Sequence, residues 1–457
     1  MSRLAFPVSG SAPLLTVCGM MAAVILALSS EASAQQTIPR AASNVPEPPI
    51  QAGEKKGAKE DEPRGFRWDD HPSLVLGEGT RIDFRLRLRG ELKGSEAPLP
   101  DEAEDDASAI DIPRRRIGIG GEILNLFDYQ VEGELAAERD PWRDVYINYK
   151  QFPFAELMAG KFKLPFSLDE NTSSTNLDFA FRSRGADLLA PGRDRGVMVH
   201  GRVLERGVLE YEIGTFAHDG RNARRNDSGR VHGDRTAAGR AVVQPWRSKK
   251  SAMRDLAFGV AFTTSTLAEG FPDLRGRTPL DLPFYRPDLW VQGERRRVGV
   301  QFRWRPGPYS LKSEYMRLTD QRLEQSVEDT DLSPFLATAW YVSGTWAITG
   351  EAKAEGLERP RRALFQGGYG AVELAARIEN VRFGSVATDG VPSAGPRADV
   401  VLGNGDRIGT IGVNWYVNRW IKVQMNLIRE AILEPDDGPL PASPSFWSRV
   451  LRFQFSL

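Results

Sequence analysis

The chain has 457 residues, of which 41% are hydrophobic and 26% charged, and its mean hydropathy is -0.38. These values fit a soluble protein and a transmembrane barrel equally, because only every second residue of a barrel strand faces lipid. The formal net charge of -1 gives no support to nucleic-acid binding.

Residue types needed for thiol and metal chemistry are scarce. The one cysteine, Cys18, lies in an apolar N-terminal stretch, so a mature chain without that stretch has no thiol. The histidines are scattered along the chain at positions 71, 200, 218 and 232. We therefore expect no disulfide, no metal, no cofactor and no catalytic residue, and we predict that the protein is not an enzyme.

Residues 1–34 have the order of a secretory signal peptide. Arg3 gives a weakly positive start, residues 14–28 are mainly apolar, and Ala32-Ser33-Ala34 before Gln35 forms a small-residue cleavage site. An uncleaved membrane anchor is the alternative. Residues 35–78 follow as a disordered or tether segment, because their Pro, Lys and Glu content leaves little apolar surface to bury. No later segment approaches the roughly 18 consecutive apolar residues of a spanning helix.

From residue 79 to 457 the dominant period is two, which defines one barrel domain. Between Arg81 and Arg89 every even position is apolar and every odd position is charged. A strand places these charges on one face, whereas a helix would spread them around its axis. Sixteen such segments are predicted, at 81–90, 113–123, 128–138, 142–151, 155–164, 194–204, 208–216, 236–246, 254–264, 296–305, 308–318, 335–349, 367–382, 405–416, 420–430 and 446–456.

The spacing of these segments indicates the fold class. Their number is even, short links such as 306–307 alternate with long polar ones such as 165–193, and the last segment runs to the C-terminus. We therefore predict an all-β protein, a 16-stranded antiparallel transmembrane β-barrel with one loop folded inward as a constriction. A soluble β-sandwich or propeller would show the same alternation, but not these features together.

Six stretches of the chain are more specific than the alternation, namely Pro113–Arg116, Gly160–Phe166, Arg184–Asp187, Pro191–Gly201, Tyr369–Arg377 and Asn414–Asn418. They closely resemble the phosphate-selective porin O and P family. The resemblance covers nearly all of the chain after residue 80, and the terminal Leu457 departs from the usual final Phe. It implies a trimeric outer-membrane barrel with a basic, anion-preferring channel.

The alternation also predicts which residues line the channel. Arg and Lys on the face opposite the apolar one would attract small anions, and the planar guanidinium matches phosphate oxygens. Residues 167–195 form the longest early loop, which we expect to be the constriction. The expected substrate-binding, channel-lining residues are Arg85, Arg87, Arg114, Arg116, Lys161, Lys163, Arg182, Arg184, Arg193, Arg195 and Arg452.

These residues predict passive diffusion of small anions across a bacterial outer membrane, with phosphate and polyphosphate as the expected substrates. The expected partners are those anions, outer-membrane lipid and two further copies of the chain, with no nucleic acid. Carboxylates such as Glu132 and Glu134 also fall on the lumen face, so a mixed lining remains open. Other functions left open are a channel for organic acids or sugars, an enzyme using His200 or His218, and a plugged scaffold barrel. A sugar slide is disfavoured because most aromatic residues fall on the lipid face.

Overall fold

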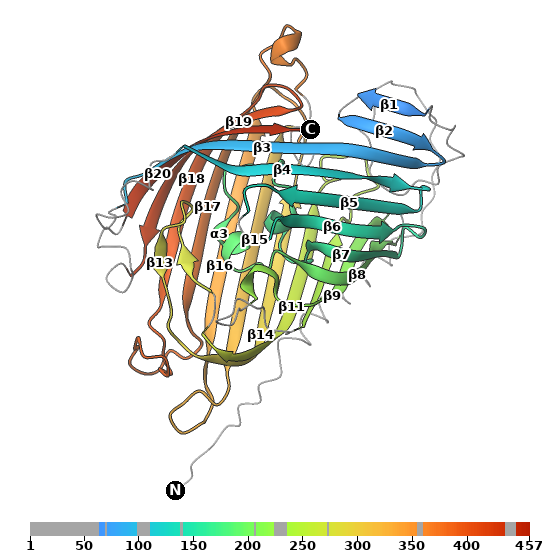
Figure 1. The fold of residues 1–457 in the computed structure, drawn as a ribbon. Coiled ribbons are helices and arrows are strands. Elements are labelled where there is room, and N and C mark those ends of the chain that lie inside the picture. The colour runs from blue at the N-terminus through green and yellow to red at the C-terminus, as the bar shows by residue number, and fades with distance from the viewer. Residues whose placement is uncertain are drawn as a thin grey trace, which may run out of the picture. The chain divides into compact units, whose positions relative to one another are not determined.

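The computed structural model describes residues 64–68, 71–97, 110–137, 140–204, 207–223, 235–271, 274–353, 360–434 and 445–457. The predicted signal peptide and most of the predicted tether lie outside these residues. The described part is almost entirely β-structure (Figure 1). No helix within it is long and apolar enough to cross a membrane.

Sixteen strands form a closed antiparallel barrel, as predicted. Each strand pairs with the next along the chain, and the last pairs with the first to close the sheet. The strands are β3 (Thr80–Ser95), β4 (Ile110–Ile123), β5 (Phe127–Glu134), β6 (Trp142–Tyr149), β7 (Glu156–Lys163), β8 (Arg193–Val203), β9 (Leu209–Phe216), β10 (Thr236–Val243), β11 (Ala257–Gly270), β14 (Val291–Trp304), β15 (Tyr309–Arg322), β16 (Leu332–Ala347), β17 (Ala371–Ser385), β18 (Asn404–Tyr416), β19 (Ile421–Ile432) and β20 (Ser445–Ser456).

The predicted strand bounds differ most at one end of the barrel. The strand predicted at 254–264 runs to Gly270, and the one predicted from 296 starts at Val291. The two remain paired there, with Thr266 opposite Glu294. Backbone pairing thus continues into a region where polar residues interrupt the alternation on which the prediction relied.

The prediction that residues 35–78 form a disordered or tether segment is wrong for its last residues. Its last residues form two strands, β1 (Gly65–Trp68) and β2 (Pro72–Gly77), that pair with each other. β2 also pairs with the start of β3, placing Ser73 opposite Asp83. β20 pairs only with residues 87–95 of β3, so the first residues of β3 offer a free edge, and β2 fills it. The Pro- and Lys-rich residues before them masked this short apolar stretch in the composition.

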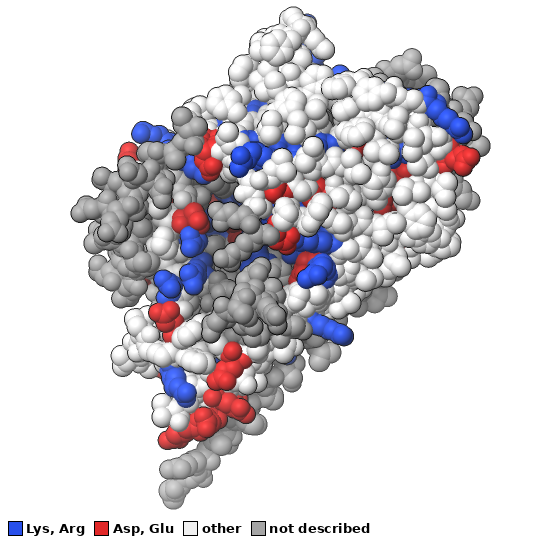
Figure 2. Space-filling model, viewed as in Figure 1, with Lys and Arg blue, Asp and Glu red and all other residues white. Residues whose placement is uncertain are grey.

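Side chains alternate between the two faces of the wall as expected. In β14, Val298 and Val300 are about half exposed on the outside, whereas Arg295 and Arg297 are buried on the inside. Figure 2 shows the result on one face: the surface over β5–β8 carries few charged side chains, and charges gather around the hollow near the middle of the view.

Two segments at one end of the barrel fold inward. Residues 164–192, called the inner loop, connect β7 to β8 and contain α2 (Leu168–Asn171) and α3 (Arg184–Leu188). Residues 274–290 lie between β11 and β14 and contain β12 (Gly276–Arg277) and β13 (Pro283–Tyr285). Short 3-10 helices lie at Gly220–Asn222 (η3) and Leu364–Gln366 (η4).

The apolar core lies inside the barrel, between these two segments and the inner wall. Phe166 and Leu189 of the inner loop belong to one buried cluster with Phe284 of β13 and with Met316 and Phe335 of the wall. This core fills one side of the lumen. It therefore fixes the inner loop against the wall and confines any passage to the opposite side.

Candidate channel and its constriction

The inner loop is attached to the wall by hydrogen bonds and ion pairs from several strands. Glu314 of β15 accepts hydrogen bonds from the backbone at the start of α2. The Asn426 side chain of β19 accepts one from the Ala180 N–H at 2.6 Å. Arg377 of β17 donates to the carbonyl of Phe181 at 3.1 Å. These bonds join residues far apart in sequence, so the loop conformation depends on the closed barrel.

Asp178 is the main ionic attachment of the inner loop. Its carboxylate lies 2.7 Å from Lys312 of β15 and 2.7 Å from Lys353, which follows β16. Burial alone would raise the pKa of Asp178, but the two ammonium groups outweigh it and hold that pKa well below its usual range. Asp178 is therefore ionised at neutral pH.

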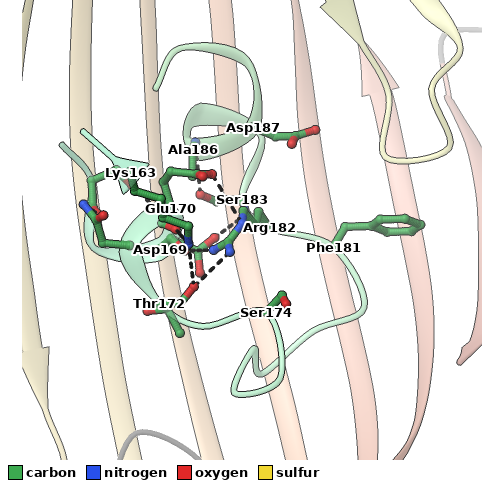
Figure 3. Close-up of polar contacts among 12 residues, drawn as sticks. Lys163, Asp169, Glu170, Thr172, Ser174, Phe181, Arg182, Ser183, Ala186 and Asp187 are labelled. Atoms are coloured by element: carbon green, nitrogen blue, oxygen red, sulfur yellow. Dashed lines mark hydrogen bonds and ion pairs between the residues drawn. The ribbon is translucent and has the colours of Figure 1, made fainter. Parts of the chain in front are cut away.

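Arg182 connects parts of the inner loop to one another through hydrogen bonds and an ion pair (Figure 3). Its guanidinium donates to the carbonyls of Asp169 and Thr172 and lies 3.3 Å from the carboxylate of Glu170. Lys163, at the end of β7, also donates to the carbonyls of Glu170 and Thr172. Burial raises the pKa of Glu170, but Arg221, Arg182 and Lys163 outweigh that effect and lower it to about 2.

A cavity of about 820 Å³ lies between the inner loop and the wall formed by β3–β8. Ten cationic side chains line it, compared with five carboxylates. The cations are Arg85, Arg87, Arg114, Arg116, Arg143, Lys161, Lys163, Arg182, Arg193 and Arg221. The carboxylates are Asp140, Asp144, Glu170, Asp187 and Glu212.

Each of the five carboxylates is already neutralised by a cation. The pairs, with their separations, are Asp140–Lys161 at 2.5 Å, Asp144–Arg193 at 2.8 Å, Glu170–Arg221 at 2.6 Å, Asp187–Arg184 at 3.1 Å and Glu212–Arg240 at 2.9 Å. The cavity therefore carries an excess of positive charge that its own carboxylates do not cancel.

Two arginines of the cavity form no ion pair within the described residues. Arg85 of β3 donates to the amide oxygen of Gln130 at 2.6 Å, and Arg143 of β6 lines the cavity without a carboxylate partner there. Two neighbours are paired instead: Arg87 lies 3.1 Å from Glu132, and Arg116 contacts both Glu132 and Glu134. Arg85 and Arg143 are thus the guanidinium groups most available to an anion.

Eight of the eleven predicted lining residues line this cavity, and three do not. Arg184 belongs to α3 of the inner loop, is buried, and donates to the Thr278 carbonyl. Arg452 is buried against Glu91. Arg195 is exposed on the outer face of β8, which it shares with Val197. The prediction had taken residues up to 195 as loop, where no alternation applies.

Sequence reasoning missed several lining residues. Arg143 is the second residue of β6, a strand with no other basic residue, and Arg221 belongs to a different loop, so neither lay in a predicted basic row. It also missed four apolar residues on the inner faces of β6–β8, namely Tyr146, Met158, Phe162 and Met198. The sequence did contain a signal for these residues. On β6 and β7 the even-numbered positions, such as Tyr146, Asn148, Met158 and Gly160, share the inner face of the barrel.

The two histidines considered for catalysis have structural partners. The ring of His200 lies 2.9 Å from the Asn148 side-chain oxygen, and that of His218 lies 3.4 Å from Asp194. In the described part of the chain, no cluster of His, Cys, Asp or Glu could hold a metal ion.

Comparison with known families agrees with this architecture. A family model described as phosphate-selective porin O and P matches residues 84–431. The chain belongs to this family. The resemblance seen in the sequence is therefore confirmed, and this porin is a channel of the bacterial outer membrane.

Solved structures show the same fold at low sequence identity. OmpT of Vibrio cholerae, in a form lacking loop L8, is 14% identical to the porin with a TM-score of 0.50, covering 82% of this chain and 99% of that one. In-vitro folded OmpT of Vibrio cholerae, described as a trimer form, gives the same identity, coverage and TM-score. None of the curated proteins compared with the chain matches it.

Proposed function

We propose that small anions, with phosphate and polyphosphate as the first candidates, diffuse passively through this porin. The observation that carries the proposal is the unequal charge of the cavity. Ten cations face five carboxylates there, and every one of those carboxylates is held in an ion pair. Such a surface concentrates anions and repels cations.

The arrangement suits transport better than tight binding. Arg85, Arg87, Arg114 and Arg116 come from two neighbouring strands, and Arg87 lies opposite Arg116 in the register. An anion can therefore pass from one guanidinium to the next. Paired N–H donors match phosphate oxygens, while the carboxylate partners of Arg87 and Arg116 weaken anion binding at those two arginines. Several weak sites permit release, which one strong site would prevent.

The proposal also covers the oligomeric state of the porin and its contact with the membrane. The outer face of the barrel is apolar along β3 and β14, which suits contact with outer-membrane lipid. We propose a homotrimer, for which the trimer form of the structurally similar OmpT gives support. The predicted cleavage after residue 34 belongs to the same proposal.

Planar-bilayer recording of the purified porin tests the proposed selectivity. In a potassium chloride gradient, the reversal potential should have the sign of a chloride-selective channel. The double variant Arg85→Gln with Arg143→Gln removes both unpaired guanidinium groups and should move the reversal potential toward zero. Arg195→Gln is the control for each of the two single substitutions, because it too removes one positive charge, but from the outer face of the barrel.

Two results would overturn parts of this proposal. A cation-selective or unselective wild-type channel would exclude anion transport altogether. Chloride current that inorganic phosphate fails to block up to millimolar concentration would exclude phosphate specificity, and leave a channel for other small solutes such as organic acids.

A further inference from the structure

One wall of the cavity is apolar, and the proposed attraction of anions by arginines does not account for it. The lumen face of a water-filled barrel is ordinarily polar. Here the inward positions of three consecutive strands carry Tyr146 on β6, Met158 and Phe162 on β7, and Met198 on β8, and all four line the cavity. They face the same space as the arginines of β3 and β4.

This apolar wall is a continuous packed layer. Phe162, Met198 and Phe216 belong to one buried cluster, against which Tyr146 and Met158 pack. The rings of Tyr146 and Phe162 are 6.4 Å apart and those of Phe162 and Phe216 are 5.4 Å apart, both pairs edge-to-face. Edge-to-face pairs of this kind hold aromatic rings in fixed orientations.

Two glycines allow the close approach of the strands that carry these rings. Gly160 lies opposite Tyr146 in the register, and Gly196 lies opposite both Gly160 and Phe216. A Cβ atom at Gly196 would lie 2.4 Å from the Phe216 ring, and one at Gly160 would lie 2.2 Å from the Val145 carbonyl oxygen and 2.7 Å from the Tyr146 Cα. A side chain at Gly196 would therefore displace a ring of the aromatic wall, and one at Gly160 would displace the backbone that carries Tyr146.

The aromatic wall adjoins an available guanidinium. Tyr146 lies directly opposite Gln130, and the Gln130 side chain accepts a hydrogen bond from Arg85 at 2.6 Å. Arg85 also lies over Gly120, where a Cβ would come within 3.2 Å of its guanidinium. A cation without a carboxylate partner in the described residues is thus next to an aromatic ring across two strands.

We propose that this cavity selects small organic anions that carry an aromatic ring, of which aryl carboxylates are the simplest. The carboxylate would contact Arg85 while the ring lies against Tyr146 and Met158. Inorganic phosphate can use the first of these contacts and gains nothing from the second. This inference rests on the proposed anion transport and specifies the substrate class that the same cavity prefers.

Block of the chloride current by two carboxylates, one with and one without an aromatic ring, separates the contributions of charge and ring to anion binding. Benzoate and acetate carry the same charge and the same carboxylate. In an ordinary water-filled pore they would compete with chloride about equally. An aromatic contact should let benzoate block at a concentration roughly two- to tenfold lower than acetate, the range expected for one aromatic pair.

Substitutions of Tyr146 identify the wall responsible. Tyr146→Ala should remove the advantage of benzoate and leave block by acetate unchanged, whereas Tyr146→Phe should retain that advantage. Tyr129→Ala is the matched control, because Tyr129 lies on the neighbouring strand opposite the outward Ile147. If Tyr146→Ala fails to fold, Met158→Gln replaces an apolar contact at similar volume and should reduce the same advantage.

The outcomes distinguish this inference from the proposed function. Equal block by benzoate and acetate in an anion-selective wild-type channel would overturn the inference alone. A Tyr146→Ala channel that still favours benzoate as strongly as the wild type would overturn it too. A wild-type channel without anion selectivity would instead overturn the proposed function, on which this inference rests.

Discussion

Glu314 of β15 caps the first helix of the inner loop, accepting a hydrogen bond from the Leu168 N–H at 2.6 Å. Its other oxygen accepts from the Asp169 N–H at 2.9 Å and from the Ser167 hydroxyl at 3.2 Å. A helix start has unpaired N–H groups, which a carboxylate satisfies well. Here the carboxylate comes from the barrel wall, so the cap also fixes the loop in the lumen.

Replacing this cap should loosen the constriction. Glu314→Ala removes acceptors for two backbone N–H groups and should cost about 1 kcal/mol of stability, the usual value for a lost helix cap. Single-channel recordings should show larger current fluctuations, because the inner loop samples more positions. Tyr315→Phe, on the outer face of the same strand, provides the comparison. Quiet Glu314→Ala channels would show that the core alone holds the loop.

Removal of the Asp178 carboxylate should weaken the inner loop more strongly. Asp178→Asn leaves Lys312 and Lys353 buried without their shared anion, and breaking a buried ion pair costs about 3–5 kcal/mol. Lys353 keeps its ion pair with Glu373, which places the expected loss at the lower end of that range. Urea unfolding in detergent measures this loss, and limited trypsin digestion should cut the inner loop of the variant faster. Unchanged unfolding and digestion would contradict this account of Asp178.

The Glu170 ion pairs predict a dependence of stability on pH. The folded pKa of Glu170 is lowered from 4.5 to about 2, so the ionised side chain stabilises the fold above pH 4.5 and loses that effect as pH falls toward 2. Wild-type porin should therefore unfold at higher urea concentration than Glu170→Gln at pH 7, and the difference should shrink at pH 3. A difference of equal size at both pH values would mean that the ionised form is not responsible.

Gly196 provides a test of the aromatic wall as a structural unit. In Gly196→Ala the new methyl group would meet the Phe216 ring and the Thr215 carbonyl oxygen at about 2.5 Å or less. Overpacking of this kind costs about 1–3 kcal/mol. Heat-modifiability on gels should show unfolding at lower temperature. Gly239→Ala is the comparison, since a Cβ there has its nearest contact at 3.7 Å. Equal stability of the two variants would contradict the view that Gly196 is needed to avoid a steric clash with Phe216.

The sequence predicted the fold closely because alternation is local to each strand. Arg81–Arg89 shows its two faces in nine consecutive residues, whatever the rest of the chain does. All sixteen barrel strands were found this way, and so were the arginines of β3 and β4 that line the cavity. The prediction failed where alternation was absent or misplaced, as at β2 and at Arg195.

What the tertiary structure alone decided is which charges remain available. Arg295, Arg297 and Arg452 have the same residue type and the same inward direction as Arg85, yet contacts with Asp219 and Glu91 bury them. Those partners lie 76, 78 and 361 residues away along the chain. No local pattern specifies such pairs, because they form only when the barrel closes and its loops fold into the lumen.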